Sequence, residues 1–151
     1  MAKGIGIQFS IFSSVIGENL SLLLATDRIM VFPWPASMEI DYQIVVTVSR
    51  FDGKPGETVF LNARWTLLEG RNKKVLLIKN SSLSSSSGLG YEALVASQSR
   101  LIGDLSFEIA EAIQAISQET GNQEEEMALY RSKNGLRAEG FQQNIQKRFL
   151  N

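Results

Sequence analysis

Residues 41–68, DYQIVVTVSRFDGKPGETVFLNARWTLL, contain two apolar-patterned runs joined by a turn with two glycines and a proline. Apolar or aromatic side chains occupy alternate positions of each run, as is typical of strands with one buried face. In the first run these residues are Tyr42, Ile44, Val46 and Val48. In the second run they are Val59, Leu61, Ala63, Trp65 and Leu67. The pattern predicts a long antiparallel hairpin whose apolar face is covered by another part of the chain.

Two shorter segments extend the predicted sheet. Ile29–Phe32 favours a short strand, which ends at Pro33 and Pro35 because proline cannot donate a ladder hydrogen bond. Val75–Ile78 favours a third strand that pairs with the second run of the hairpin as a meander. The serine-rich segment Ser81–Gly90 is interpreted as a flexible loop, since serine side chains compete for backbone hydrogen bonds.

Apolar stripes at helical spacing predict two helices, over Ile11–Ala25 and Tyr91–Ile116. The stripe of the second helix comprises Tyr91, Leu94, Val95, Gln98, Ile102, Leu105, Ile109, Ala112, Ile113 and Ile116. Two striped helices and one apolar sheet face predict an α+β fold. We expect a two-layer sandwich in which two helices cover an antiparallel β-meander.

The composition changes after Glu119, where the chain becomes polar and mixed in charge. Apolar residues such as Met127, Leu129 and Tyr130 suffice for frayed or partner-stabilised helices but not for a second core. Residues 11–118 are therefore expected to form the α/β domain, and residues 119–151 a polar carboxy-terminal tail.

Bulk composition excludes several classes of protein. The 151 residues include 15 lysines and arginines against 16 aspartates and glutamates, which disfavours nucleic-acid binding. Cysteine and histidine are absent, which removes disulfides, thiol catalysis, the commonest general base and the commonest metal ligand. No run approaches the roughly 20 apolar residues of a membrane-spanning helix.

Catalysis has two candidate sets of residues. Ser81–Ser87 lie near Lys79, but the S-x-x-K pattern of serine–lysine catalysis is missing, so a solvated linker is the preferred interpretation. Asp104, Glu108 and Glu111 are spaced as paired carboxylates or metal ligands, yet such a row is more often the wet face of a helix. We therefore predict no enzyme activity, no cofactor and no metal site.

Aromatic residues supply the candidate binding surface. Trp65 shares the parity of Leu61 and Leu67 and is predicted to be in the core. Trp34, between two prolines, suits either packing or an exposed contact with a partner. Phe32, Trp34 and Tyr42 are the residues that we expect to bind a partner.

Three segments, taken in order, resemble a known family. VFPWPASMEIDYQIVVTVSRFDG, ARWTLLEG and GYEALVASQSRLIGDLSFEIAEAI, preceded by ENLSLLLATDRIM, are similar to the ABC-transporter auxiliary lipoproteins, the PqiC-like family of Gram-negative bacteria. The resemblance covers about residues 11–116. It implies a fold similar to the amino-terminal domain of TolB and a non-catalytic role. It also implies an MCE-domain protein and a membrane permease as partners in moving phospholipid between membranes.

The resemblance carries expectations about location and assembly. Family members are outer-membrane-associated periplasmic lipoproteins that begin with a signal peptide and a lipobox cysteine, followed by strands. None of these is recognisable in residues 1–10, so an amino-terminally shortened member is expected. A sheet without its first strands would expose a pairing edge and favour a homo-oligomer.

The leading interpretation is an assembly or binding subunit of an ABC/MCE-type lipid-transport system. A second interpretation, from a different class, is a small module that binds an apolar ligand between the helices and the sheet. Retention of a lipid or metabolite by the monomer would distinguish the second interpretation from the first.

Overall fold

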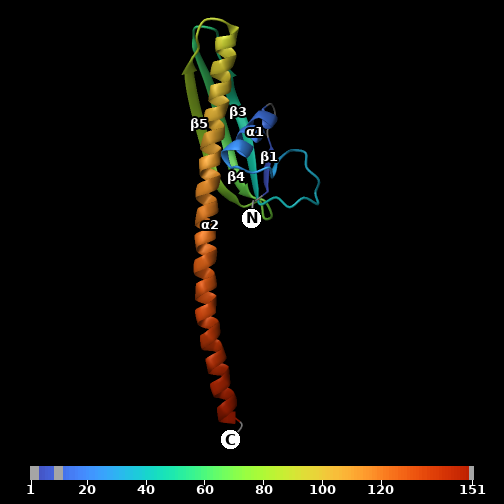
Figure 1. Cartoon of the computed structure of the whole chain (residues 1–151), viewed down its shortest axis with the longest axis vertical. Coiled ribbons are helices and arrows are strands. Elements are labelled where there is room, and N and C mark those ends of the chain that lie inside the picture. The colour runs from blue at the N-terminus through green and yellow to red at the C-terminus, as the bar shows by residue number, and fades with distance from the viewer. Residues whose placement is uncertain (1–3, 9–11, 150–151) are drawn as a thin grey trace. The chain divides into compact units, whose positions relative to one another are not determined.

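The computed structural model describes residues 4–8 and 12–149, with side chains described for residues 4–7 and 12–134. The chain divides into two compact units, Met1–Ile113 and Gln114–Asn151. The elements in chain order are β1 (Ile5–Gln8), α1 (Ser13–Leu23), β2 (Ile29–Val31), β3 (Tyr42–Asp52), β4 (Thr58–Glu69), β5 (Val75–Ser86) and α2 (Tyr91–Phe149) (Figure 1).

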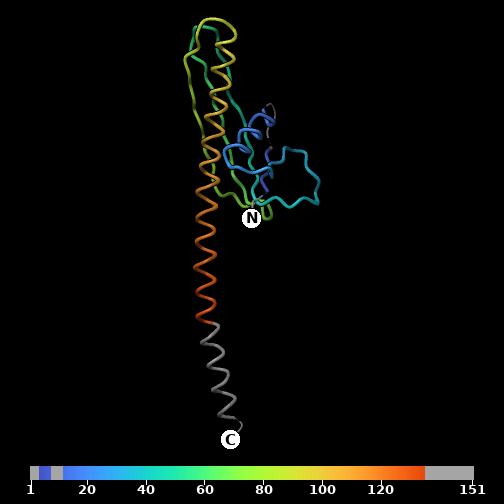
Figure 2. Tube along the Cα trace, viewed as in Figure 1, coloured from blue at the N-terminus to red at the C-terminus, as the bar shows by residue number. Residues whose placement is uncertain are grey.

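The first unit contains a mixed five-stranded sheet in the order β2-β1-β3-β4-β5. Strands β3, β4 and β5 form the predicted antiparallel meander, which Figure 2 shows as three adjacent runs of the trace. Strand β1 pairs in parallel with both β2 and β3. The α+β sandwich predicted from the sequence is confirmed.

Strand β1 comes from the residues that the sequence analysis left unmatched. Ile5 and Ile7 are buried, and Ile7 lies beside Ile44 of β3. The exposed edge that was expected next to the meander is therefore filled by β1. Four residues, one of them a glycine, carry too little apolar pattern to reveal a strand, and the pairing with two neighbours supplies its stability.

The serine-rich segment is a strand, and the prediction of a flexible loop for its first six residues was wrong. Strand β5 continues through Ser86, with Ala63 opposite Ser81 and Val59 opposite Ser85. The long β4 strand offers backbone partners along this whole stretch, and these outweigh the weak strand preference of serine. Ser87 and the glycines that follow form the connection to α2.

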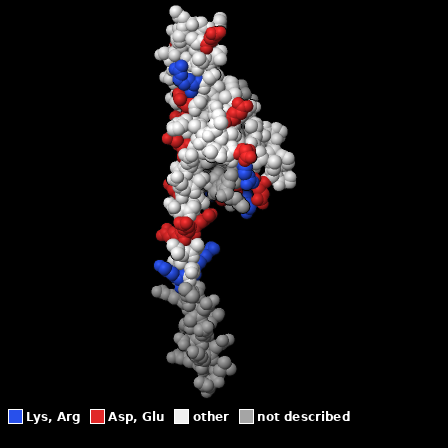
Figure 3. Space-filling view, viewed as in Figure 1, with Lys and Arg blue, Asp and Glu red and all other residues white. Residues whose placement is uncertain are grey.

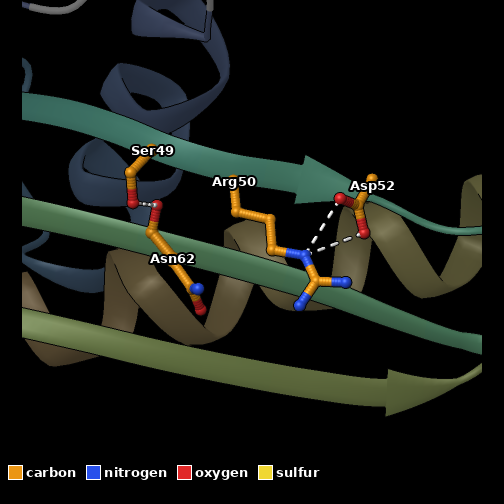
Figure 4. A network of polar contacts seen from close by, with 4 residues as sticks. All are labelled: Ser49, Arg50, Asp52 and Asn62. Carbon is orange, nitrogen blue, oxygen red and sulfur yellow. Dashed lines mark hydrogen bonds and ion pairs between the residues drawn. The ribbon is translucent and has the colours of Figure 1, made fainter.

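A bulge in β3 changes which residues face the helices. Val48 is opposite Ala63, but Arg50 is opposite Asn62, which leaves Ser49 as the extra residue. The Ser49 hydroxyl donates a hydrogen bond to the Asn62 carbonyl oxygen at 3.3 Å, as Figure 4 shows. Beyond the bulge the alternation shifts by one residue.

The shift brings Phe51 onto the helix-covered face, opposite Leu61. There its ring meets that of Phe12 edge to face, at a centroid distance of 5.0 Å. Arg50 donates from Nε to both carboxylate oxygens of Asp52, at 2.9 and 3.1 Å (Figure 4).

Both helices cover the same face of the sheet. In α1, Gly17 lies against Val31 and Ile7, and Ile16 and Leu20 are buried. Asn19 of α1 donates to the Ser106 hydroxyl oxygen of α2 at 3.2 Å. The buried apolar residues of α2 are Leu101, Ile102, Leu105, Ile109, Ala110 and Ile113. Trp65 is fully buried beneath this layer, as predicted.

The apolar stripe of α2 differs from the prediction at both ends. Tyr91 and Val95 are 80% and 58% exposed, although they lie on the predicted stripe. Helix α2 does not end at Ile116 but continues to Phe149. The residues beyond Ile116 include no proline and many good helix formers, so nothing in their sequence terminates the helix.

Candidate partner-binding surface

The connection between β2 and β3 lies on the face of β1 opposite the helices. Because side chains alternate along a strand, Ile5 and Ile7 face the helices and Gly6 faces away. A β carbon on Gly6 would lie 2.9 Å from both the Trp34 ring and the Ile40 side chain. The glycine therefore leaves room for an indole ring to lie directly on the backbone of β1.

Three hydrogen bonds through Asp41, two of them between backbone groups, hold the end of this connection in place. The Gly4 amide donates to Asp41 Oδ2 at 2.8 Å, and the Asp41 amide donates to the Gly4 carbonyl oxygen at 2.8 Å. The Gly70 amide, at the end of β4, donates to the Asp41 carbonyl oxygen at 2.8 Å. These bonds fix the end of the connection to both β1 and β4.

The three predicted partner-binding residues differ in accessibility. Phe32 is 54% exposed, and its ring contacts the Trp34 ring edge to face at 5.4 Å. Trp34 is half-buried because one side of its ring covers Gly6. Tyr42 is only 4% exposed and belongs to the core of the sheet. Phe32 and Trp34 are thus the accessible members of the predicted set.

Sequence reasoning missed two residues of this surface. Met38 is 48% exposed on the same connection, and Gly6 provides the seat for Trp34. The alternation Gly4-Ile5-Gly6-Ile7 gives the strand one apolar face and one face without side chains, but it is too short to predict a strand by itself. We call residues 32–38 the aromatic loop.

The aromatic loop continues directly from an edge strand of the sheet. Strand β2 is three residues long, and the Phe32 amide extends its pairing by donating to the Ile7 carbonyl oxygen at 2.9 Å. At the opposite edge lies the twelve-residue β5. The apolar side chain of Phe32 therefore lies at the edge of the sheet, next to the short strand β2, a combination that suits binding by strand or loop addition.

The candidate catalytic residues are partly brought together. Lys79 and Ser81 share the inner face of β5 and meet Glu108 of α2. The Ser81 hydroxyl donates to Glu108 Oε2 and accepts a hydrogen bond from Trp65 Nε1 at 3.0 Å. Lys79 Nζ lies 3.8 Å from Glu108 Oε2. We call these four residues the Ser81 cluster.

The Ser81 cluster has the geometry of a structural link. Ser81 is 4% exposed and its oxygen both donates and accepts, so it is occupied in joining β4 to α2. Glu108 was expected on the wet face of the helix but points to the sheet, whereas Asp104 and Glu111 are exposed. Within residues 4–7 and 12–134, the acidic side chains form no group of three that could hold a metal ion.

A shallow depression on the surface is lined by Tyr91, Glu92, Val95 and Ala96. All four residues belong to the first turns of α2, so this depression differs in place from the ligand pocket predicted between the helices and the sheet. In the part of the chain that the structure describes, no helix has the length and apolar character needed to cross a membrane.

Comparison with known families agrees with this fold. The family model of the ABC-type transport auxiliary lipoprotein component matches residues 10–110. The chain belongs to this family. The resemblance drawn from the motifs between residues 11 and 116 is therefore confirmed. A comparison with curated proteins gives no match for this auxiliary lipoprotein family member.

Solved structures share the fold at low sequence identity. Protein XCC0632 from Xanthomonas campestris is 11% identical with a TM-score of 0.60, and the match covers 81% of this chain and 89% of that one. The PelC dodecamer from Paraburkholderia phytofirmans is 14% identical with a TM-score of 0.52, covering 68% and 84%. A minor lipoprotein from Acinetobacter baumannii is 16% identical with a TM-score of 0.51, covering 76% and 94%.

Proposed function

We propose that this auxiliary lipoprotein family member is a non-catalytic assembly or binding subunit of an ABC/MCE-type phospholipid transporter. Its partners in this proposal are an MCE-domain protein and the membrane permease, and its location is the periplasm at the outer membrane. The observation that carries the proposal is the family match over residues 10–110. The aromatic loop supplies a surface through which such a subunit would bind.

The aromatic loop suits protein binding because its exposed ring is held on a fixed base. Phe32 is braced by Trp34, which is seated on Gly6. A rigid aromatic side chain loses little conformational freedom on binding, which is why such residues dominate the energy of many interfaces. On the face that Figure 3 shows, charged side chains of the first unit are scattered among uncharged atoms, which favours apolar recognition over electrostatic recognition.

The Ser81 cluster supports a non-catalytic role. Its serine hydroxyl is buried and bonded on both sides, so it has no free path to attack a substrate. The cluster instead joins the sheet to α2 and would keep the scaffold rigid.

Self-association is compatible with an assembly role. One solved structure of similar fold, PelC from Paraburkholderia phytofirmans, is a dodecamer. A homo-oligomeric ring or stack would present several aromatic loops to a transporter at once, which raises avidity without new contacts.

Co-purification with the MCE-domain protein of the same organism tests the proposal. We expect the wild-type chain to retain the MCE-domain protein, and Phe32→Ser to reduce that retention about tenfold through loss of a buried aromatic contact. Leu22→Ser is the matched control, because Leu22 is 82% exposed on α1 and outside the aromatic loop. If the wild-type chain never retains an MCE-domain protein, the proposed function is wrong. If Phe32→Ser and Leu22→Ser reduce retention equally, the aromatic loop is not the binding surface.

A further inference from the structure

The second unit contains a helical segment without a described core of its own. Residues 121–134 are exposed throughout, and residues 114–120 are exposed or half-buried. The exposed side chains include Met127, Leu129 and Tyr130, at 54%, 64% and 64%. A single helix that is exposed on all sides is marginally stable in water and gains stability by burying an apolar stripe.

A seam with alternating spacings of four and three residues runs along this segment. Its members are Ile116, Thr120, Gln123, Met127, Tyr130 and Asn134. Sustained spacing of this kind places side chains at the a and d positions of a coiled coil. The Thr120 hydroxyl donates to the Ile116 carbonyl oxygen at 2.9 Å, so its polar group is satisfied within the helix and its methyl group is free to pack.

Charged residues flank the seam in two blocks of opposite sign. Glu124 and Glu126 lie on either side of the seam just before Met127, at e and g positions. Arg131 and Lys133 occupy the same two positions one heptad later. In the second unit, Figure 3 shows these blocks as a red band followed by a blue one.

We propose that this segment pairs with the same segment of a second copy of the chain, in antiparallel orientation. With Met127 opposite Tyr130 of the second copy, the acidic block of each helix lies beside the basic block of the other. Glu124 then faces Arg131, and Glu126 faces Lys133, on both sides of the pair. In the same register Gln123 meets Asn134, which gives a polar layer whose two amides complement each other.

The charges favour this orientation over a parallel one. A parallel pair in register would place Glu126 beside Arg131 of the second copy but also Glu119 beside Glu124, so that repulsion between like charges offsets the attraction. In the antiparallel pair, all four contacts between the two blocks join opposite charges. The pairing is independent of the proposed transport function, because it uses no residue of the aromatic loop.

Sedimentation of the full chain over a range of concentrations measures the pairing. We expect a monomer–dimer equilibrium, and about tenfold weaker self-association or more for both Arg131→Glu/Lys133→Glu and Glu124→Lys/Glu126→Lys. An equimolar mixture of the two double variants should recover the wild-type affinity. Glu125→Lys is the control, since Glu125 lies away from the seam and should leave the affinity unchanged.

Apolar variants test the seam itself. Met127→Ser should weaken the dimer about tenfold or more, whereas Leu129→Ser, at an exposed position off the seam, should not. A full chain that stays monomeric at every concentration overturns the proposal. Equal effects of Met127→Ser and Leu129→Ser would overturn it too.

Introduced cysteines determine the orientation, because the natural chain has none. A mixture of Gln123→Cys and Asn134→Cys chains should form the mixed disulfide, and Gln123→Cys alone should remain reduced. In an antiparallel pair two copies of residue 123 lie about 16 Å apart along the axis at 1.5 Å per residue, beyond disulfide reach. A parallel pair would reverse both results, and efficient cross-linking of Gln123→Cys alone would therefore refute the antiparallel arrangement.

Discussion

Ser81 connects three elements through one oxygen atom. It accepts from Trp65 of β4 and donates to Glu108 of α2, while it lies on β5 itself. A hydroxyl is one of the few small groups able to both donate and accept. Alanine at this position would therefore leave Trp65 Nε1 without this acceptor and would remove the hydrogen bond to Glu108, which keeps the ion pair with Lys79.

Ser81→Ala is expected to lower the free energy of unfolding by about 1–3 kcal/mol, the cost of leaving such groups unsatisfied. The change should appear as a melting temperature several degrees lower, measured by circular dichroism. Ser82→Ala is the matched control, because Ser82 is an exposed neighbour on the same strand. If the two variants melt together, the Ser81 cluster contributes nothing measurable to stability.

The burial of a side chain was predictable from the sequence where it depends only on the apolar pattern of its strand or helix. Trp65 was placed in the core by its parity with Leu61 and Leu67, and it is fully buried. Glu108 was predicted on the solvent-exposed face of the helix, but it lies at the margin of the apolar stripe. Its carboxylate faces the sheet because it accepts a hydrogen bond from the Ser81 hydroxyl, a partner that the helix sequence alone does not reveal. Tyr42 was expected at a binding surface, but its place within a paired central strand buries it.

Strand β5 shows how pairing overrides local preference. Its serines favour irregular structure in isolation, yet β4 pairs with them as far as Ser86. The hairpin was predictable because its alternation spans two long runs. Strand β1 was not predictable, because its four residues offer almost no pattern. The packing of Trp34 against Gly6 could not be predicted either, since it depends on the three-dimensional positions of both residues.

Hydrogen exchange distinguishes a paired β5 from a flexible loop. Amides of residues 81–86 that point toward β4 should exchange at least tenfold more slowly than those of residues 88–90, because exchange requires breaking the ladder. Their neighbours, which point away from β4 at the edge of the sheet, should exchange quickly and serve as an internal control. Uniformly fast exchange across residues 81–90 would restore the loop interpretation.

The chain combines a sheet-based unit with a helical one. The division between them falls after Ile113, within α2, and the change in composition follows a few residues later. The domain boundary after residue 118 stays a prediction. Helical continuity explains why the sequence does not mark the division, since a helix passes from one environment to another without a turn or a proline.

Deletion of residues 119–151 tests the independence of the first unit. We expect residues 1–118 to melt within about 2 °C of the full chain, because the buried apolar side chains of α2 lie between Leu101 and Ile113. The same deletion should abolish self-association through the second unit. A large loss of melting temperature would instead show that the helical segment supports the sheet.

The chain has two tryptophans, and they lie on opposite faces of one sheet. Trp65 is sealed under α2, whereas Trp34 is half-open to solvent on the aromatic loop. Their fluorescence should therefore separate into a shielded component and one accessible to a quencher such as acrylamide. In Trp34→Phe the remaining fluorescence comes from Trp65, and in Trp65→Phe it comes from Trp34. Each single-tryptophan variant therefore allows the unfolding of one face of the sheet to be followed over time without an attached dye.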